Sequence, residues 1–384
     1  MHIVILGGGF AGLSAANKLK QRLRGKKDVQ ILLIDKNDYT TMIPSLPDLA
    51  GGGIEKSFLT ERIEKLIPKG VHFRKASVEK IDFTSKQIFI GQETITYDYL
   101  IVAVGSKTNF FGFDQNLDKL YTLESLEDSL RICRDFEKAL NSGKEINLVI
   151  SGAGFTGIEL ACCLNRLAQK YNREIPVTLI EKQNRILTAI SDEMLDEVER
   201  EIGRLGFKII KNDYVEAFDG STVYLKNSGA IPDAFFCWCS GVRMSVPTEG
   251  NHKKIYDDRI IVDEFLKIPE HPEVFVVGDA AAVMDKGSYL RRSVNYAAMM
   301  GKTAAGNIAA AISGAQGKCF KPLDLGWVIP VNVTSIGMAL GHQIKGRLGI
   351  LMHYIICGVK NYNFKNFMRF FMSAFSFAFQ KKHR

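Results

Sequence analysis

The feature that most constrains the fold of this chain is a strand–turn–helix unit that occurs twice. An apolar run, HIVIL, leads into glycines at positions 7, 9 and 12, and a later run, EINLVIS, leads into glycines at 152, 154 and 157. A helical stretch follows each turn, from Leu13 to about Arg24 and then up to about Tyr171, and a second strand follows each helix. A Gly-x-Gly-x-x-Gly turn in this context is typical of dinucleotide-binding α/β domains. The duplication predicts two such domains within 384 residues.

An acidic residue ends the second strand of each unit. Asp35 closes VQILLID (29 to 35), and Glu181 closes VTLIE (177 to 181). Each lies a little over twenty positions beyond the last glycine, where a carboxylate accepts hydrogen bonds from a ribose 2′-hydroxyl. Because a 2′-phosphate would meet a like charge at Glu181, this residue favours NADH over NADPH.

Two further stretches combine a strand with a glycine. YDYLIVAVGSKTNFFG (97 to 112) leaves its strand at Gly105, and VFVVGDAAAV (274 to 283) ends at Gly278 and Asp279, followed by small residues that we expect to begin a helix. A carboxylate beside a glycine after a strand suits hydrogen bonding to a polyol chain while the backbone packs closely. In this order, around two glycine turns, we expect these stretches to belong to a binding site and not to be plain buried strands.

The composition excludes several other classes of protein. The net charge is +8, but no interleaved basic and aromatic stripe indicates nucleic-acid binding. The seven cysteines contain no C-x-x-C pair, so neither a metal site nor a thioredoxin-type pair is predicted. Met1 runs directly into an apolar strand without a basic leader, which favours a cytoplasmic protein.

The last stretch, NFKNFMRFFMSAFSFAFQKKHR (363 to 384), has the pattern of an amphipathic helix. A narrow polar stripe recurs at helical spacing among many phenylalanines, and the apolar run is too short to span a bilayer. It fits a helix that lies in the membrane interface, with KKHR on anionic head groups. The alternative is a helix packed on the protein or on a second subunit. The run LGILMHYIICGV (348 to 359) is a second helix of the same expected anchor.

By these residues the sequence resembles the two-dinucleotide-binding-domain flavoproteins, and more narrowly the type II NADH:quinone oxidoreductases. The resemblance covers residues 1 to about 310 and is carried by GGGFAGL, LIDKNDY, IPSLPDLAGG, YDYLIVAVGSKTNFFG, TLESLEDSLRI, GAGFTGIELA and VGDAAA. It implies non-covalent FAD in the first site and NADH, as substrate, in the second. The implied reaction passes a hydride from NADH to FAD and then electrons to a membrane quinone of the menaquinone type, without proton pumping. It implies a peripheral respiratory-chain enzyme on the cytoplasmic face of the cell membrane.

The resemblance also assigns residues to the cofactors. Val78 is assigned by its backbone, from KASVEKID (75 to 82), and Glu159 is assigned to substrate placement or proton supply. Its alternative role is that of an acid in the first helical turn that complements the helix dipole. The implied FAD contacts are Gly7, Gly9, Ala11, Gly12, Asp35, Lys36, Val78, Ala103, Gly105 and Asp279. The implied NADH contacts are Gly152, Gly154, Thr156, Gly157, Glu159, Glu181 and Gly241.

The sequence departs from the family at the acceptor site. The family signature Ala-Gln-x-Ala-x-Gln, on a helix that caps the flavin, matches Val294, Asn295, Tyr296, Ala297, Ala298 and Met299 in SVNYAAMMGKTAAGNI (293 to 308). Asparagine offers a shorter amide, and methionine cannot donate a hydrogen bond. We therefore expect an altered acceptor site for a different quinone or another acceptor. Tyr296 offers either a compensating hydroxyl or packing.

Three alternatives stay open. A sulfide:quinone oxidoreductase would use cysteines beside the flavin, and Cys133, Cys162, Cys163 and Cys357 are its candidates, although Phe155 stands where that family has a cysteine in the second turn. A disulfide reductase would need a redox cysteine near the first turn, and residues 1 to 132 contain none. A non-catalytic flavin-binding protein would not be bleached by NADH.

The expected fold is α/β, with two Rossmann-like dinucleotide-binding domains and a C-terminal amphipathic, membrane-binding helical segment. The FAD domain is expected to be discontinuous, and the C-terminal segment is expected to contact the membrane and to support a homodimer. The expected boundaries are 1–118 and 258–335 for the FAD domain, 119–257 for the NADH domain, and 336–384 for the C-terminal segment.

Overall fold

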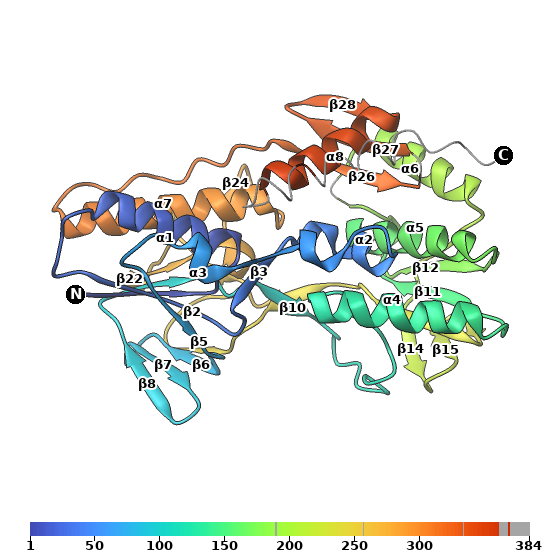
Figure 1. Ribbon diagram of the computed structural model, residues 1–384, viewed down its shortest axis with the longest axis horizontal. Coiled ribbons are helices and arrows are strands. Elements are labelled where there is room, and N and C mark those ends of the chain that lie inside the picture. Colours follow the sequence, from blue (N-terminus) through green and yellow to red (C-terminus); the bar gives the residue numbers. More distant parts are fainter. Residues whose placement is uncertain (189, 256, 333, 361–367, 369–384) are drawn as a thin grey trace. The chain divides into compact units, whose positions relative to one another are not determined.

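The computed structural model describes residues 1–188, 190–255, 257–332, 334–360 and 368. Its contacts divide the chain into two compact units, both of which are discontinuous in sequence (Figure 1). The first unit comprises residues 1–40, 61–107 and 242–324, and the second comprises residues 41–60, 108–241 and the chain from 325 onward. The expected domain boundaries given above stay a prediction.

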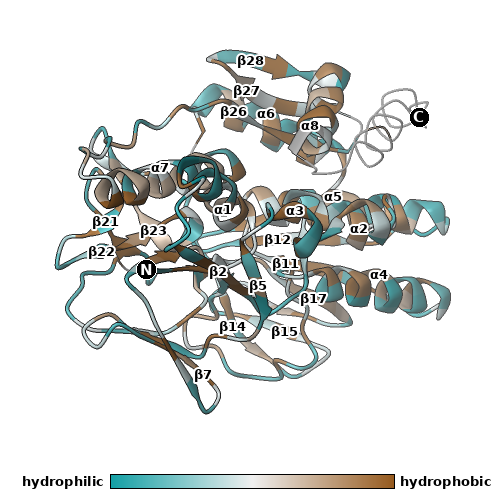
Figure 2. Cartoon of the chain, turned by 60° about the vertical axis from the view of Figure 1, so that its left-hand side comes forward, coloured by the Kyte–Doolittle hydropathy of each residue, from teal (hydrophilic) through white to brown (hydrophobic). Residues whose placement is uncertain are grey.

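A six-stranded sheet forms the centre of the first unit. Its order is β21-β22-β9-β1-β2-β5, and all neighbours are parallel except β21 and β22. β2 in the interior of this sheet is apolar between its two end residues, whereas β5 at the edge is mainly polar, as the colours of Figure 2 show. The strands are β1 (His2–Leu6), β2 (Gln30–Asp35), β5 (His72–Lys75), β9 (Tyr99–Val102), β21 (Lys267–Ile268) and β22 (His271–Val276).

Two long helices of the first unit, α1 (Phe10–Arg22) and α7 (Val294–Ile312), pack side by side (Figures 1 and 2). Their close approach depends on Gly301, because a Cβ there would collide with the carbonyl oxygen of Ala11. The two helices and the sheet share one apolar core. The glycine turn after β1 and the start of α7 are thereby fixed to the same framework.

Smaller elements complete the first unit. A second sheet has the order β19-β6-β7-β8, and two further pairs are formed by β20 with β23 and by β24 with β25. The elements are α3 (Ile63–Leu66), β6 (Lys80–Asp82), β7 (Gln87–Ile90), β8 (Glu93–Thr96), β19 (Thr248–Glu249), β20 (Ile260–Ile261), η3 (Gly278–Ala280), β23 (Ala281–Ala282), β24 (Met284–Asp285) and β25 (Ser288–Tyr289).

The second unit repeats the α/β plan with a four-stranded parallel sheet. Its order is β13-β12-β11-β17, with α4 and α5 sharing the core of the sheet. A capping box at Ser125 and Asp128 begins α4. The elements are α4 (Leu126–Asn141), β11 (Asn147–Ser151), α5 (Phe155–Lys170), β12 (Val177–Glu181), α6 (Asp192–Arg204), β13 (Lys208–Lys211) and β17 (Ala234–Trp238).

Two three-stranded antiparallel sheets and a final helix also belong to the second unit. α8 (Gly346–Lys360) packs on β26 and β27. The other elements are η1 (Ile43–Ser45), α2 (Leu46–Ala50), η2 (Lys56–Phe58), β14 (Val215–Phe218), β15 (Val223–Leu225), β16 (Gly229–Ile231), β26 (Gly326–Val331), β27 (Thr334–Ala339) and β28 (His342–Lys345). Four short strands lie where the chain passes between the units: β3 (Tyr39–Thr41), β4 (Thr60–Arg62), β10 (Ser106–Thr108) and β18 (Val242–Met244).

The structure confirms the strand–turn–helix units and corrects two local expectations. The first helix begins at Phe10 and not at Leu13, because Gly9 is its extended N-cap and Gly12 lies inside it. The residues directly after Asp279 do not begin an α-helix. A single 3₁₀ turn, η3, returns the chain to the short strand β23, which pairs with β20.

The structure describes the first of the two segments of the expected membrane anchor, but only one residue of the second. The stretch 348–359 lies within α8, so its helical assignment is confirmed. The expected amphipathic helix at 363–384 lies outside the described residues, apart from Met368. Of the helices that the structure describes, none combines the length and the apolar character needed to cross a membrane.

Candidate functional site

The first glycine turn is shaped by backbone contacts at its ends and by open space in its middle. Gly7 adopts a φ of 104°, and a Cβ there would collide with the carbonyl oxygen of Ala103 on the neighbouring strand segment. A Cβ at Gly12 would collide with the carbonyl oxygen of Gly7. At Gly9, by contrast, a Cβ would meet nothing within 4 Å. Packing therefore explains the first and third glycines, whereas the second borders open space that a ligand could enter.

Asp35 is tied to this turn by its carboxylate. One oxygen accepts the N–H of Gly8 at 2.5 Å, and the other accepts the N–H of Asn37 at 2.8 Å. Burial raises the pKa of Asp35, and the two backbone donors only partly oppose that rise. Each oxygen keeps a further lone pair, so the carboxylate is held in place to accept a ribose hydroxyl.

The second turn reproduces the first, contact by contact. Gly152 adopts a φ of 98°, and a Cβ there would meet the carbonyl oxygen of Cys239. A Cβ at Gly157 would collide with the carbonyl oxygen of Gly152, and a Cβ at Gly154 would meet nothing within 4 Å. The same two glycines serve packing, and the same middle glycine faces open space.

The carboxylate of Glu181 accepts hydrogen bonds from the same two places in its turn as the carboxylate of Asp35 does in the first turn. Its carboxylate accepts the N–H of Ala153 at 3.1 Å and the N–H of Gln183 at 3.0 Å. Ala153 occupies the place in its turn that Gly8 has in the first. Both turns thus present an open cradle at the start of a long helix, beside a fixed carboxylate. These are the features that a dinucleotide pyrophosphate and ribose require, so the residues present fit two dinucleotides.

The other residues assigned to FAD lie on the first unit around its turn. Ala11 and Ala103 are buried, Lys36 is exposed, and Gly105 has a positive φ of 71° with open space beside it. Val78 lies in the connection between β5 and β6 and not within a strand. Asp279 accepts a hydrogen bond from the hydroxyl of Ser106 at 2.9 Å. The first unit therefore brings these residues to the carboxyl end of its central sheet.

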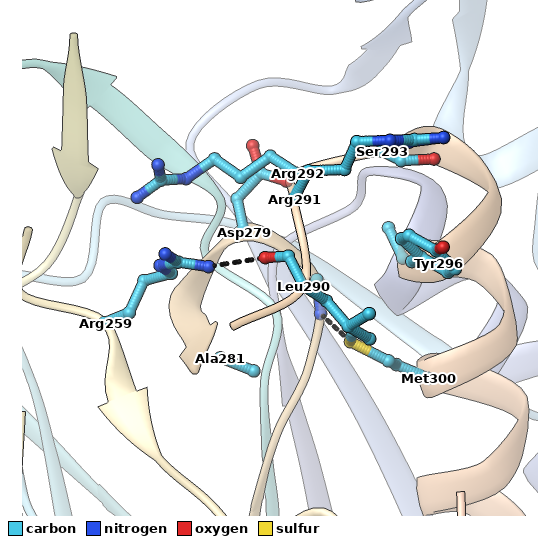
Figure 3. Close-up of a pocket in the computed structure, with 11 residues that line it drawn as sticks. Arg259, Asp279, Ala281, Leu290, Arg291, Arg292, Ser293, Tyr296 and Met300 are labelled. Atoms are coloured by element: carbon cyan, nitrogen blue, oxygen red, sulfur yellow. Dashed lines mark hydrogen bonds between the residues drawn. The ribbon is translucent and has the colours of Figure 1, made fainter. Parts of the chain in front are cut away.

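A small pocket adjoins Asp279 and the start of α7 (Figure 3). Its walls carry Arg259, Arg291 and Arg292, together with Tyr296 and Met300 of α7. Arg259 donates to the carbonyl oxygen of Leu290 at 2.8 Å, as the dashed line in Figure 3 marks. Three arginines around one pocket favour an anionic or strongly accepting group.

A buried carboxylate orients two of these arginines. Asp257 accepts from Nε of Arg259 at 3.0 Å and from Nη2 of Arg292 at 2.9 Å. Nε of Arg292 is buried without a hydrogen-bond partner among the described residues. Asp257 thus holds two of the three guanidinium groups of the pocket in place, and Arg291 pairs with Asp324 at 2.6 Å.

The remaining NADH assignments lie on the second unit. Thr156 is exposed in the first turn of α5. The carbonyl oxygen of Gly241 accepts a hydrogen bond from the backbone N–H of Asn109 at 2.9 Å. Nε1 of Trp238 donates to the carbonyl oxygen of Asn109 at 3.0 Å. Gly241 lies against the ring of Phe111, 3.0 Å from where a Cβ would be.

Glu159 differs from its expected setting. α5 begins at Phe155, so Glu159 is its fifth residue and lies just beyond the first turn, which contains no acidic residue. The helix dipole acts within the first turn, so it does not explain this acid. Glu159 is partly buried, and burial raises its pKa to about 8, with Asp48 adding to the rise and His353 opposing it. This environment favours the protonated form of the Glu159 carboxyl.

The acceptor-site assignment falls on the first two turns of α7, as expected. Nδ2 of Asn295 donates to the carbonyl oxygen of Leu323 at 2.8 Å and lies 3.5 Å from Sδ of Met299. Tyr296 is buried beside Arg291, and burial and Asp324 raise its pKa. Ala297 is buried and Ala298 is partly buried. The Asn295 amide therefore makes bonds within its own unit, and the burial of Tyr296 supports its packing role.

A family model described as pyridine nucleotide-disulphide oxidoreductase matches residues 1–304, which include both glycine turns and the first part of α7. The chain belongs to this oxidoreductase family. Among curated relatives, a type II NADH:quinone oxidoreductase of Staphylococcus saprophyticus is 26% identical and one of Staphylococcus aureus is 25% identical, and each match covers 92% of this chain and 93% of the relative.

Solved structures of similar fold extend over nearly the whole chain. NDH2 from Plasmodium falciparum, in complex with NADH, has a TM-score of 0.85 at 17% identity and covers 99% of this chain and 98% of its own. The sulfide:quinone oxidoreductase of Aquifex aeolicus has a TM-score of 0.80 at 18% identity, covering 96% and 92%. Both confirm the expected α/β fold for this member of the oxidoreductase family.

Sequence reasoning missed two groups of residues in this oxidoreductase. Ser106 lies within the stretch YDYLIVAVGSKTNFFG, which gives no role to its hydroxyl. The Asp257–Arg259–Arg292 group comes together only through the fold, and no motif signals it. The same holds for His353, which influences Glu159 across more than 190 positions of sequence. The only signal for Asp48 was its place within IPSLPDLAGG, which gave no role to the carboxylate.

Proposed function

We propose that this protein oxidises NADH and reduces a quinone, with FAD as its bound cofactor. The observation that carries the proposal is the repetition of one geometry in two units: an open glycine cradle beside a carboxylate fixed by two backbone N–H groups. The names of the curated relatives supply the reaction type, and their matches extend over more than nine-tenths of both chains.

The first unit would hold FAD. The turn at Gly7, Gly9 and Gly12 cradles the pyrophosphate, Asp35 accepts from the adenosine ribose, and Asp279 with Ser106 faces the ribityl chain. When bound, FAD supplies a carrier that takes up a hydride from one substrate and releases the electrons to another. The contribution of the protein is to orient the two substrates and to exclude water.

The second unit would hold NADH. The turn at Gly152, Gly154 and Gly157 cradles its pyrophosphate, and Glu181 accepts from its ribose. Because the Glu181 carboxylate is fixed by Ala153 and Gln183, it cannot turn away from an added phosphate. A 2′-phosphate would therefore lie next to a fixed negative charge, and NADH is the expected nicotinamide substrate.

The acceptor is expected at the start of α7, where Asn295 and Met299 replace the glutamines of the related signature. The Asn295 amide already donates to Leu323, so fewer donors remain for a quinone carbonyl. This predicts that hydrogen bonding contributes less to acceptor binding, and shape and apolar contact contribute more.

Sulfide oxidation is the second candidate, because a sulfide:quinone oxidoreductase shares the fold. The state of the cysteines weighs against it. Burial raises the pKa of Cys162 to about 11, and it also raises the pKa values of Cys133 and Cys163. A protonated thiol is a poor nucleophile, so these side chains are ill suited to carry sulfur.

We further propose contact with a membrane surface, where a quinone would be met. Leu348 and Ile356 of α8 are exposed by 62% and 46%, and the basic, phenylalanine-rich stretch 363–384 follows this helix in the sequence. The same surface is the proposed contact for a homodimer. The cytoplasmic face of the membrane and the domain boundaries of the sequence analysis remain part of this proposal.

An anaerobic titration tests the proposed function. NADH is added to the purified holoprotein while the visible flavin absorbance is followed, and menadione or a short-chain ubiquinone is then added. Bleaching by NADH and recovery with a quinone is the expected result. Bleaching without recovery by any quinone would assign another acceptor, and bleaching by sulfide but not by NADH would replace the proposal with the second candidate.

A further inference from the structure

Phe111, in the second unit, combines a bulky, exposed side chain with a left-handed backbone conformation. Its φ is 51°, and the residue is 62% exposed. A left-handed conformation costs free energy for a residue with a Cβ, and a phenyl ring in solvent gains little from the hydrophobic effect. Neither backbone preference nor core packing therefore explains a phenylalanine at this position.

The turn that carries Phe111 has the pattern of a type I′ turn. The N–H of Phe113 donates to the carbonyl oxygen of Phe110 at 2.8 Å. The two residues between them, Phe111 and Gly112, have φ values of 51° and 88°. A type I′ turn needs positive φ at both central positions, and asparagine, aspartate or glycine is strongly preferred there. Gly112 follows this rule and Phe111 does not, and strain of this kind is concentrated at ligand-binding sites.

The loop around Phe111 is fixed to the end of β17. The rings of Phe110 and Phe113 pack on that of Trp238, with centroids 5.6 and 4.9 Å away. Nε1 of Trp238 donates to the carbonyl oxygen of Asn109 at 3.0 Å, and Oδ1 of Asn109 accepts the N–H of Phe111 at 3.0 Å. These contacts hold the loop on both sides of Phe111, so its exposed ring stands on a fixed support.

The Phe111 ring lies close to the second glycine turn. Its Cζ is 3.0 Å from where a Cβ on Gly241 would be, and Gly241 follows the last residue of β17 by three positions. A Cβ on Gly152, the first glycine of the turn, would collide with the carbonyl oxygen of Cys239. The short segment 239–241 therefore has the glycine turn at one end and the Phe111 ring at the other.

The strand order of the sheet assigns the two halves of a dinucleotide to its two sides. β12 and β17 lie on opposite sides of β11, which leads into the glycine turn. A dinucleotide binds across the carboxyl ends of such strands, with its pyrophosphate at the turn and its adenosine ribose on the acid that ends the next strand. Glu181 ends β12, so the adenosine half would lie on that side. The nicotinamide half would then lie on the side of β17, where Phe111 is.

We propose that Phe111 binds NADH by covering its nicotinamide half with the exposed ring. An aromatic ring offers an apolar stacking surface to a planar group, and a loop that is already fixed does not have to be ordered on binding. The left-handed conformation of Phe111 holds the ring in this place. This inference rests on the proposed function for the identity of the dinucleotide, and it adds a contact to those of the glycine turn and Glu181.

Replacing Phe111 by Asn removes the ring and keeps the turn, because asparagine is a preferred residue at this position. The variant should therefore be at least as stable as wild type in thermal denaturation. It should bind NAD⁺ about three- to tenfold more weakly, since the stacking surface is lost. Equilibrium titration of NAD⁺ into the oxidised holoprotein measures this loss, and NAD⁺ is chosen because it binds without reducing the flavin.

AMP, which carries the adenosine half alone, separates the two ends of the site. Phe111→Asn should bind AMP as wild type does, whereas Glu181→Gln should lose affinity for both nucleotides. An equal loss of AMP and NAD⁺ affinity in Phe111→Asn would mean that Phe111 only shapes the glycine turn. Unchanged affinities for both would mean that the ring contacts neither nucleotide, and either result overturns the inference.

The hairpin of β27 and β28 provides a matched control in the same unit. Its two loop residues, Leu340 and Gly341, repeat the geometry of the Phe111 turn, with φ values of 50° and 83°, and Leu340 is 69% exposed. Leu340→Asn should also be at least as stable as wild type, but it should leave both nucleotide affinities unchanged. A similar loss of NAD⁺ affinity in Leu340→Asn would assign the effect to the change of turn residue and overturn the role of the Phe111 ring.

These titrations contain no quinone, so they distinguish the inference from the proposed function. A selective loss of NAD⁺ affinity in Phe111→Asn supports the inference even if no quinone reoxidises the flavin, which would refute only the quinone reaction. Wild type that binds neither NAD⁺ nor AMP would refute the proposed NADH site, and the role of Phe111 would fall with it.

Discussion

At the scale of single residues, Asp35 and Glu181 have the same position and the same hydrogen bonds beside the two glycine turns. Each carboxylate accepts one N–H from the middle of a glycine turn and one from two residues further along the chain. These bonds fix the carboxylate before any ligand binds. The binding of the ribose therefore does not have to supply the free energy of ordering this side chain.

Replacing Glu181 by Gln should weaken NADH binding and leave FAD binding unchanged. A hydrogen bond to a charged group contributes about 1.5–3 kcal/mol, so we expect the NADH dissociation constant to rise about tenfold or more. Equilibrium titrations of both ligands measure this. Asp35→Asn is the matched variant and should do the reverse, and equal losses of both ligands in either variant would contradict the assignment of the two turns.

Glu159 should make the stability of the protein depend on pH. Its folded pKa, about 8, lies above the ordinary value of 4.5, so between these values the folded state holds more protons than the unfolded state. Stability should therefore fall as the pH rises through this window. Glu159→Gln cannot ionise, and its stability relative to wild type should rise by more than about 1.4 kcal/mol from acid to mildly alkaline pH.

Denaturation midpoints of the holoproteins at the two ends of this window measure the effect. Glu174→Gln, at an exposed position, controls for the loss of one carboxylate and should follow wild type at both ends. A constant difference between Glu159→Gln and wild type would mean that Glu159 ionises as an ordinary exposed acid.

At the scale of elements, the glycine turns separate packing from binding. Gly157→Ala should destabilise the protein because its Cβ would collide with the carbonyl oxygen of Gly152 where α5 leaves the turn. Gly154→Ala should fold normally, since open space surrounds that position, but should bind NADH less tightly because the space is the one the pyrophosphate would take. Thermal denaturation and NADH titration of both variants test the distinction.

Gly203→Ala serves as the control for these two variants. Gly203 lies inside α6 with no atom within 4 Å of an added Cβ, and alanine is favoured over glycine in a helix by about 1 kcal/mol. This variant should therefore be slightly more stable and bind NADH as wild type does. If Gly157→Ala were as stable as Gly203→Ala, the packing role of the third glycine would be refuted.

The sequence predicted these elements well where a local pattern encodes them. The strands next to the two glycine turns, the strands that end near Gly105 and Gly278, both turns and the acids at positions 35 and 181 follow from periodicity and spacing. The sequence did not predict the features that depend on contacts between distant parts of the chain. The small residues after Asp279 form a 3₁₀ turn and a strand because β23 pairs with β20. The pKa of Glu159 is raised mainly by burial in the fold, while His353 opposes the rise and Asp48 adds to it, and both of these residues lie on other helices. The spacing of residues within a motif does not indicate partners that lie so far away in the sequence.

At the scale of the whole molecule, neither compact unit is one continuous stretch of sequence. The first is assembled from three segments, and the second also from three. Each has its own apolar core and its own glycine turn. The proposed division of labour, with FAD on the first unit and NADH on the second, therefore predicts that each ligand stabilises the unit that binds it.

Ligand-dependent stabilisation of the full chain tests this division. A ligand at a hundred times its dissociation constant adds about 2.7 kcal/mol to the stability of the state that binds it. FAD added to protein freed of flavin, and non-reducing NAD⁺ added to the holoprotein, should each raise the denaturation midpoint. Asp35→Asn should reduce only the FAD increment, and Glu181→Gln only the NAD⁺ increment, when both ligands are kept at fixed concentration. If either variant lost both increments, one turn would have to serve both dinucleotides, and the assignment of one site to each unit would fail.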